Sequence, residues 1–260
     1  MRALDVLKRC DAILAEDTRN TAKLLSIHGI SRPLIPYNDH NGARVRPKIL
    51  KRLENGDRLA LVSDAGTPLI SDPGYKLVRE ATAAGEKVHA VPGASAALAG
   101  LILSGLPTNR FLFVGFLPAS RDARRAALDE FRTLIMTLIF FEAPQRLKET
   151  LEDMSSLLGA RQVAVARELT KLHEDVHRGN LQDLAAFYDS NPPRGEVTVI
   201  VGPPQPGPPD FSRADALLDK ALAFMPLRAA VELVSEGLNL PRKAVYARAL
   251  LRKSVQSNGD

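Results

Sequence analysis

The sequence is poor in the residues that build disulfide frameworks and metal clusters. Its 260 residues include a single cysteine, Cys10, and no tryptophan. One cysteine excludes an intrachain disulfide framework, and the five histidines do not combine with it in any spacing typical of metal ligands. We therefore expect a protein of the reducing cytoplasm that has no metal centre.

Long hydrophobic runs are also missing. No apolar run approaches the roughly 18 residues that indicate a membrane span, and the N-terminus lacks the charged-then-apolar pattern of a secretory signal. Hydrophobic residues make up 45% and charged residues 25% of the chain, and the formal net charge is +5. This composition predicts a globular protein whose basic balance is compatible with an anionic partner such as nucleic acid but does not require one.

Short runs typical of strands alternate with stretches typical of helices along most of the chain. This rhythm predicts an α/β fold with parallel or mixed sheets. The expected strands are 12–15, 58–62, 87–91, 111–116, 134–141, 162–166 and 196–201. The expected helices between them are 21–28, 45–54, 75–84, 95–103, 146–158 and 181–190.

Glycine and proline mark two breaks in this pattern. The first precedes a new strand and places a domain boundary near Asn109. The second, rich in proline, predicts a stiff linker followed by three helices at 213–224, 227–236 and 241–253 with helix-turn-helix spacing. The predicted parts are an α/β domain at 1–109, a second α/β domain at 110–202, a linker at 203–210 and a helical domain at 211–260.

Two turns rich in small residues give the clearest sign of a ligand site. Residues 63–74 leave one expected strand and enter a helix, and residues 91–96 repeat this arrangement with a Pro-Gly pair. In open α/β sheets, ligands bind at such turns beyond the carboxyl ends of strands. A tight connection is the alternative for either turn alone, but the pair favours a shared pocket. Neither turn matches a glycine-rich phosphate-binding signature.

Charged residues follow several other expected strands. Glu16, Asp17 and Arg19 follow the first strand, residues 167–174 follow a later one, and Glu142 closes a third. Helix capping or a solvated loop is the alternative in each case. Two adjacent carboxylates beside a guanidinium are, however, more than capping requires.

Together, and in this order, the segments 15–19, 62–74, 91–96, 141–144 and 167–171 resemble the tetrapyrrole methylase superfamily. The resemblance runs from Arg2 to about Lys253 and is closest to the ribosomal RNA branch, which methylates the ribose 2′-hydroxyl of a decoding-site cytidine. It implies two α/β domains with S-adenosylmethionine in the cleft between them, often in a homodimer, and a small helical C-terminal domain. The implied partner is 16S ribosomal RNA or the small ribosomal subunit.

The resemblance also implies roles for individual residues. The cofactor would be bound by Asp64, Ala65, Gly66, Thr67, Pro68, Leu69, Ser71, Pro92, Gly93, Ser95, Ala96, Phe141, Glu142, Arg167, Glu168 and Leu169. Glu16 and Asp17 are the candidate acceptors of the hydroxyl proton, and Arg19 and Lys171 would complete the catalytic set by holding phosphate or developing charge.

Basic residues in two places are candidates for binding RNA phosphates. They are Arg121, Arg124 and Arg125 after the fourth expected strand, and Arg242, Lys243, Arg248, Arg252 and Lys253 on the last helix. A solvated helix face is the alternative for both groups.

The resemblance departs from its family at the start of the chain. Family members begin with a hydrophobic strand and a Pro/Gly turn that contributes to the cofactor pocket, whereas residues 1–7 have the pattern of a helix interior without an N-cap. A misassigned start, a truncated chain and a real loss are the alternatives. Two other functions stay open. One is a tetrapyrrole-precursor methyltransferase of the same superfamily, which would use a similar cleft, and the other, because of this missing start, is a catalytically incomplete RNA- or ribosome-binding module.

Overall fold

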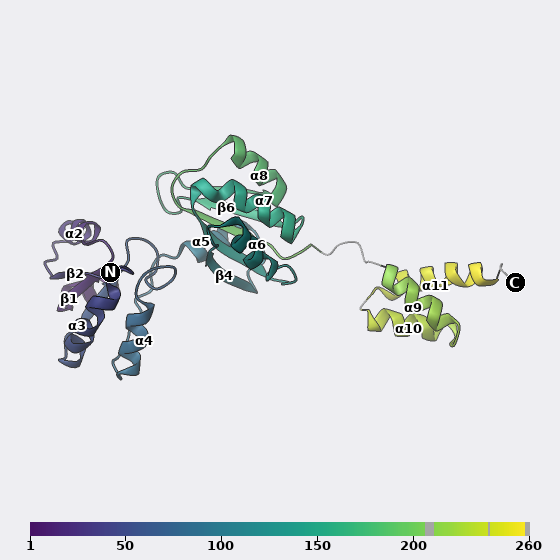
Figure 1. Ribbon diagram of the computed structural model, residues 1–260, viewed down its shortest axis with the longest axis horizontal. Helices are drawn as coiled ribbons and strands as arrows, with labels where there is room; N and C mark the ends of the chain where they lie inside the picture. Colours follow the sequence, from purple (N-terminus) through teal and green to yellow (C-terminus); the bar gives the residue numbers. More distant parts are fainter. Residues whose placement is uncertain (206–210, 239, 258–260) are drawn as a thin grey trace. The chain divides into compact units, whose positions relative to one another are not determined.

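A computed structural model describes residues 1–205, 211–238 and 240–257 of the chain. The chain divides into two compact units, Met1–Pro204 and Gln205–Asp260. The first unit contains two separate β-sheets with their covering helices, and the described part of the second is helical (Figure 1). Most of the predicted linker, residues 206–210, lies outside the described residues.

The first sheet is parallel and has the order β2-β1-β3. Its strands are β1 (Ala12–Ala15), β2 (Leu34–Pro36) and β3 (Leu59–Val62). Helices α1 (Arg2–Arg9) and α2 (Thr18–Ile27) cover one face, and α3 (Gly42–Glu54) and α4 (Tyr75–Ala83) cover the other. Successive residues of β1 point to opposite faces, so Ile13 packs with α1 and α2 while Leu14 packs with α3 and α4.

The strand predicted at 87–91 is wrong. This segment forms no ladder, and its Val88 is 51% exposed. A strand pattern becomes a strand only when a neighbour supplies hydrogen-bond partners, and β3 pairs with β1 alone among the described strands. Strand β2 was not predicted, because three residues that include a proline carry almost no strand pattern.

The second sheet has the order β4-β5-β8-β6-β7. Its strands are β4 (Phe111–Phe116), β5 (Thr137–Glu142), β6 (Gln162–Arg167), β7 (Asp175–Asn180) and β8 (Val197–Val201). Only the β4–β5 pair is parallel in this mixed sheet. Strand β7 was not predicted, because it lies at the edge of the sheet and its polar sequence lacks the apolar pattern of a buried strand.

Helices cover both faces of the second sheet. On one face α6 (Arg121–Asp129), α7 (Leu147–Leu158) and α8 (Leu181–Ser190) enclose the largest apolar core, and the short 3₁₀ turn η1 (Pro144–Arg146) leads into α7. On the other face lies α5 (Ala96–Ser104). A Cβ on Gly100 of α5 would lie 3.1 Å from Ile200 Cδ1, so glycine allows this close approach. Helix α5 thus packs on the second sheet although it precedes the predicted boundary at Asn109.

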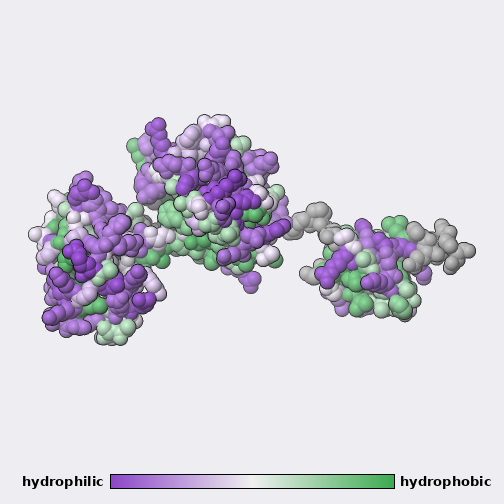
Figure 2. All heavy atoms as spheres, in the orientation of Figure 1, coloured by the Kyte–Doolittle hydropathy of each residue, from purple (hydrophilic) through white to green (hydrophobic). Residues whose placement is uncertain are grey.

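The second unit consists, in its described residues, of α9 (Ser212–Leu222), α10 (Leu227–Gly237) and α11 (Arg242–Ser257). The three predicted helices are confirmed within a few residues at each end. Their core is small and is built from residues such as Leu218, Val231 and Val245. Figure 2 shows apolar side chains also on the surface of this unit. Throughout the described ranges, no helix combines the length and apolar character needed to span a membrane.

Candidate active site

The two predicted turns meet at the carboxyl end of β3 and the start of α5. The Thr67 hydroxyl donates a 2.8 Å hydrogen bond to the Ala94 carbonyl and so ties one turn to the other. Ser95 caps α5 by accepting a hydrogen bond from the Leu98 amide. The pairing seen in the sequence therefore corresponds to a direct contact.

The first turn contains unusual backbone conformations. Leu69 and Ser71 have φ values of 74° and 63°, a region that residues other than glycine seldom adopt. Gly74 ends the turn at a φ of 132°, and a Cβ there would lie 2.6 Å from Leu61 Cδ2. Such strain clusters at binding sites, where surrounding structure holds it in place.

A cavity of about 350 Å³ opens beside these turns. Its size lies in the range of small-molecule sites, which begins at about 300 Å³. Both turns, the ends of β4 and β5, and the start of β8 contribute to its walls. The lining residues are Ala65, Gly66, Thr67, Ile70, Ser71, Asp72, Ser95, Ala96, Phe116, Phe141, Glu142, Ala143, Pro144, Gly195, Glu196, Val197 and Thr198.

The structure places about half of the predicted cofactor residues on these walls. Those on the walls are Ala65, Gly66, Thr67, Ser71, Ser95, Ala96, Phe141 and Glu142. The others do not line the cavity, and they are Asp64, Pro68, Leu69, Pro92, Gly93, Arg167, Glu168 and Leu169. A contiguous sequence motif therefore overstates the set of residues that line the cavity.

No site residue was predicted in the wall formed by Gly195, Glu196, Val197 and Thr198. These residues enter β8, which is the last strand along the chain but lies between β5 and β6 in the sheet. The Gly-Glu pair before an apolar strand is a weak signal that other loops share. Ile70, Asp72, Phe116, Ala143 and Pro144 were also missed as lining residues.

Asp72 is a partly buried acid on the cavity wall. Burial raises the pKa of its carboxyl group, and the nearby negative charge of Glu16 raises it further. Asp64 and Glu196 act in the same direction, whereas a hydrogen bond from Ser63 opposes them. This side of the cavity is therefore rich in carboxylates.

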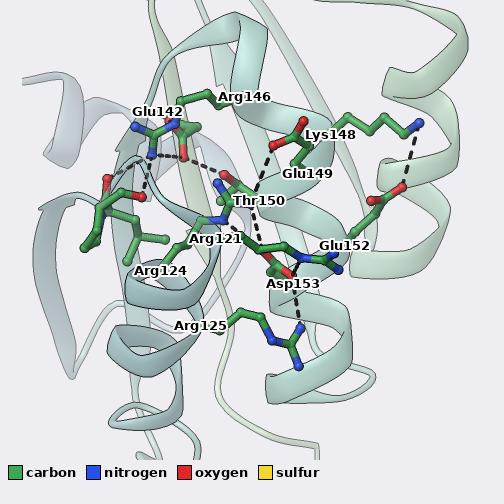
Figure 3. A network of polar contacts seen from close by, with 12 residues as sticks. Arg121, Arg124, Arg125, Glu142, Arg146, Lys148, Glu149, Thr150, Glu152 and Asp153 are labelled. Carbon is green, nitrogen blue, oxygen red and sulfur yellow. Dashed lines mark hydrogen bonds and ion pairs between the residues drawn. The ribbon is translucent and has the colours of Figure 1, made fainter.

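Glu142 ends β5 inside the cavity wall and is 2% exposed. Its carboxylate accepts hydrogen bonds from the Ala143 amide at 2.7 Å and from the Thr150 hydroxyl at 2.7 Å. Arg146 adds a third contact at 3.1 Å (Figure 3). Because the buried charge is fully partnered, Glu142 acts as a fixed part of the wall.

The three candidates after β1 have different partners. Asp17 caps α2 and also accepts hydrogen bonds from the Arg19 guanidinium, the shortest at 2.6 Å. These bonds lower the pKa of Asp17 to about 2, so it is a weak proton acceptor. Glu16 instead accepts a 3.3 Å hydrogen bond from the Asp64 amide, which links the end of β1 to the first turn.

The turn after β6 is held by its own ion pairs. The Lys171 ammonium lies 2.9 Å from Glu168 Oε1 and 3.1 Å from Glu196 Oε2, and hydrogen bonding to Glu168 raises the pKa of Lys171. Arg167 lies 3.7 Å from Asp175. Lys171 is thus committed to two carboxylates in this structure.

The three arginines of α6 converge on one buried carboxylate. Asp153 of α7 lies within 3.3 Å of Arg121, Arg124 and Arg125 (Figure 3). The predicted RNA-binding role of Arg124 is wrong, because its side chain is only 2% exposed and cannot reach a phosphate. Arg121 remains 71% exposed at the surface.

The basic residues of α11 do not form one stripe. Successive residues are rotated by about 100° around a helix, so Arg248 and Arg252 lie about 40° apart on one face, whereas Lys243 lies on roughly the opposite side. Arg248 donates from Nε to Asp215 at 2.6 Å and Arg252 pairs with Asp215 and Asp219, both on α9. Arg242 is 65% exposed, and its guanidinium lies 4.0 Å from the Glu232 carboxylate.

Comparison with known families assigns the chain to a class. Residues 1–185 match the family model of tetrapyrrole (corrin/porphyrin) methylases, and residues 208–253 match that of the RsmI C-terminal HTH domain. The chain therefore belongs to the tetrapyrrole methylase family. The predicted fold class is confirmed, including the helical C-terminal domain.

Curated relatives narrow this assignment further. The chain is 48% identical to ribosomal RNA small subunit methyltransferase I of Erythrobacter litoralis, over 98% of this chain and 90% of the relative. It is 42% identical to the protein of the same name from Mesorhizobium japonicum, over 100% of this chain and 89% of the relative. Within its family the chain thus belongs with the ribosomal RNA small subunit methyltransferases I.

Solved structures agree in fold at much lower identity. Diphthine synthase matches with a TM-score of 0.59 and 16% identity, over 78% of this chain and 83% of that one. A uroporphyrin-III C-methyltransferase from Thermus thermophilus, solved with S-adenosylhomocysteine, matches with a TM-score of 0.53 and 19% identity, over 77% and 89%.

Proposed function

We propose that the chain transfers the methyl group of S-adenosylmethionine to the ribose 2′-hydroxyl of a cytidine in the decoding region of 16S ribosomal RNA. The cavity between the paired turns and β8 is the observation that carries this proposal. The near full-length relatives at 42–48% identity, all named for small-subunit ribosomal RNA, support the acceptor class.

The cavity suits the chemistry of this cofactor. Ile70, Phe116 and Phe141 provide apolar and aromatic surface for an adenine ring and a methionine side chain. Asp72 and Glu196 provide negative charge for a cationic sulfonium and an ammonium group. When bound, S-adenosylmethionine supplies a methyl group that is already activated. The protein then has to position the two substrates and to accept the proton of the hydroxyl group.

Glu16 is the better of the two predicted proton acceptors. Asp17 is stabilised as a carboxylate by Arg19, whereas the hydrogen bond that Glu16 accepts within the described part of the chain comes from the Asp64 amide. A carboxylate with few hydrogen bonds can accept the hydroxyl proton as the carbon–oxygen bond forms. Arg19, 85% exposed, would hold an RNA phosphate beside it.

Glu16→Gln and Asp17→Asn test this assignment as a matched pair. Both changes remove one negative charge and keep the side-chain shape. We expect Glu16→Gln to slow methyl transfer in single turnover by about 100-fold, the lower end of the range for general-base catalysis, and Asp17→Asn to have a much smaller effect. Equal rates in the two variants would remove Glu16 from this role.

Phosphate contacts would come from the exposed basic residues rather than from all eight predicted ones. Arg121, Arg242 and Lys243 are exposed, whereas Arg248 and Arg252 are paired with acids of α9. Sequence-independent contacts of this kind orient an RNA without selecting its bases. Either free ribosomal RNA or an assembled small subunit could present the target, and both belong to the cytoplasm.

The homodimer is a further part of the proposal. The outer face of α5 and the edge strand β4 expose Leu98, Ile102 and Phe111, and Figure 2 shows apolar residues gathered over these elements. Exposed apolar patches mark association surfaces. Ile102→Glu should yield a monomer in light scattering, whereas Ile27→Glu, at a similarly exposed position on α2, should not. Identical masses for both variants would argue against this surface.

Two measurements on the unmodified chain separate the three functions. Calorimetry with S-adenosylmethionine separates an enzyme from a non-catalytic binding module, because the module would not bind the cofactor. Methyl transfer to purified small subunits, with the product mapped by ribose-methylation sequencing, tests the acceptor. If the chain binds the cofactor and methylates a tetrapyrrole precursor but does not methylate RNA, the tetrapyrrole-precursor methyltransferase would be supported instead.

A further inference from the structure

The cavity wall that enters β8 is fastened to the turn after β6 by a closed set of contacts. We propose that Glu168 is a positioning residue, whose carboxylate sets the wall formed by Gly195, Glu196, Val197 and Thr198 without touching the cofactor itself. We call Glu168, Lys171 and Glu196 the Glu168 brace. The cofactor part of this inference rests on the proposed function, whereas the geometry of the wall does not.

The brace combines backbone and side-chain contacts. Glu168 Oε1 accepts a 2.9 Å hydrogen bond from the Glu196 amide, and the Glu168 amide donates a 3.0 Å bond to the Glu196 carbonyl. Lys171 Nζ donates a 2.9 Å bond to the same Glu168 oxygen and lies 3.1 Å from Glu196 Oε2. Both backbone groups of Glu196 are therefore held by one residue.

Gly195 gives the Glu168 side chain its place. A Cβ on Gly195 would lie 2.2 Å from Glu168 Oε1 and 2.3 Å from Cδ, so any side chain there would displace the carboxylate from its present position. Gly195 also has a φ of 81°, which glycine adopts without strain. The Glu168 carboxylate thus occupies the space that a side chain at position 195 would need.

The turn that carries Glu168 is itself strained. Glu168 and Thr170 have φ values of 48° and 65°, which are uncommon for residues with a side chain. Thr170 is held there by a 2.5 Å hydrogen bond from its amide to the Glu174 carboxylate. Strained backbone persists only where surrounding contacts determine it, and those contacts here aim Glu168 at the wall.

The consequence for binding follows from which residues face the cavity. Glu196 and its three neighbours on the wall line it, whereas Glu168 and Lys171 do not. A wall held at both backbone groups of Glu196 is preorganised, and preorganisation lowers the entropy cost of binding. Loss of the brace should therefore weaken cofactor binding through mobility of the wall.

Hydrogen exchange of the free chain and calorimetry with S-adenosylmethionine test the proposal together. In Glu168→Ala we expect the Glu196 amide to exchange at least about tenfold faster and the cofactor to bind about tenfold more weakly, the effect of losing a charge-assisted hydrogen bond. Glu168→Gln should lie between, because its amide oxygen can still accept from the Glu196 amide.

Lys171→Met and Lys148→Met form the matched comparison. Both lysines are about equally exposed, at 44% and 42%, and each lies near two carboxylates. The carboxylates near Lys148 are those of Glu152 and Asp189, neither of which belongs to the cavity wall. Lys171→Met should speed exchange at Glu196 and weaken binding, whereas Lys148→Met should change neither.

Gly195→Ala gives a second, independent test through double substitution. Alanine should collide with Glu168 and weaken binding, and the loss in Gly195→Ala combined with Glu168→Ala should be smaller than the product of the two single losses. The proposal is overturned if Glu168→Ala leaves exchange at the wall unchanged, whatever happens to binding, or speeds exchange over the whole second sheet equally. An unmodified chain that binds cofactor but fails to methylate RNA would contradict only the proposed function.

Discussion

Substitution of Asp153 should destabilise the first unit far more than substitution of a surface acid. Asp153 is 1% exposed and its carboxylate lies 2.8 Å from Arg124, 3.0 Å from Arg125 and 3.3 Å from Arg121. In Asp153→Ala the acid that stays near the buried Arg124 guanidinium, among the described residues, is Glu149, which is 3.6 Å away and largely exposed. Leaving a buried charge without its partner costs about 3–5 kcal/mol of unfolding free energy.

Asp189→Ala is the control. Asp189 also forms a short ion pair, at 2.7 Å from Lys148, but both side chains are about half exposed. Surface pairs of this kind contribute less than about 1 kcal/mol. Urea unfolding followed by circular dichroism measures the difference, and hydrogen exchange in α6 and α7 locates it.

Two further results would support the same reasoning. Replacement of both buried partners in Arg124→Met/Asp153→Leu should lower the unfolding free energy much less than Asp153→Ala does, because no buried charge is left alone.

Burial alone would raise the pKa of Asp153, but its three arginines hold this pKa below the usual 3.8. Its contribution is therefore present above about pH 4 and is lost as the pH falls through the lowered value. Asp153→Ala with no greater loss than Asp189→Ala would refute the argument.

Two other predictions concern the turns and the C-terminal helices. Thr67→Val should weaken S-adenosylmethionine binding several-fold in calorimetry, because it removes the hydrogen bond to Ala94 that joins the two turns. Unchanged binding would mean that the two turns keep their places without this hydrogen bond. Arg242→Ala should lower RNA affinity and reduce the salt slope by about one, whereas Arg248→Ala should mainly lower the melting temperature of the second unit by leaving Asp215 without its closest partner. RNA-binding titrations at several salt concentrations and thermal melts distinguish the two variants. Weaker RNA binding in Arg248→Ala and a lower melting temperature in Arg242→Ala would contradict these roles.

Local patterns predicted the elements that are marked by a cap, an apolar period or a β-branched run within the segment itself. The helix at Leu181–Ser190 has its predicted bounds, because Asn180 caps it and its apolar period is clear. The strands β1 and β4 also have their predicted bounds. The segment 87–91 has an equally good strand pattern and forms none, since pairing depends on a partner that local pattern does not specify.

The candidate site divides in the same way. Both turns were found from sequence because glycine, proline and small residues act locally on the backbone that they belong to. The β8 wall was not found, because it reaches the cavity only through the insertion of β8 between β5 and β6. Asp17 and Glu16 are adjacent and chemically alike in the sequence, yet Arg19 makes one of them a weak base.

The residue order of this protein thus determines its α/β fold class, its alternation of strands and helices and the two turns that border the cavity, because each depends on backbone preferences and apolar periods within a short segment. Tertiary structure alone decides the rest. It buries Arg124 against Asp153, turns Arg248 toward α9 and seats Glu168 against Gly195, which is 27 residues further along the chain. Charges acquire their roles from the partners that folding brings to them, and those partners are distant in sequence.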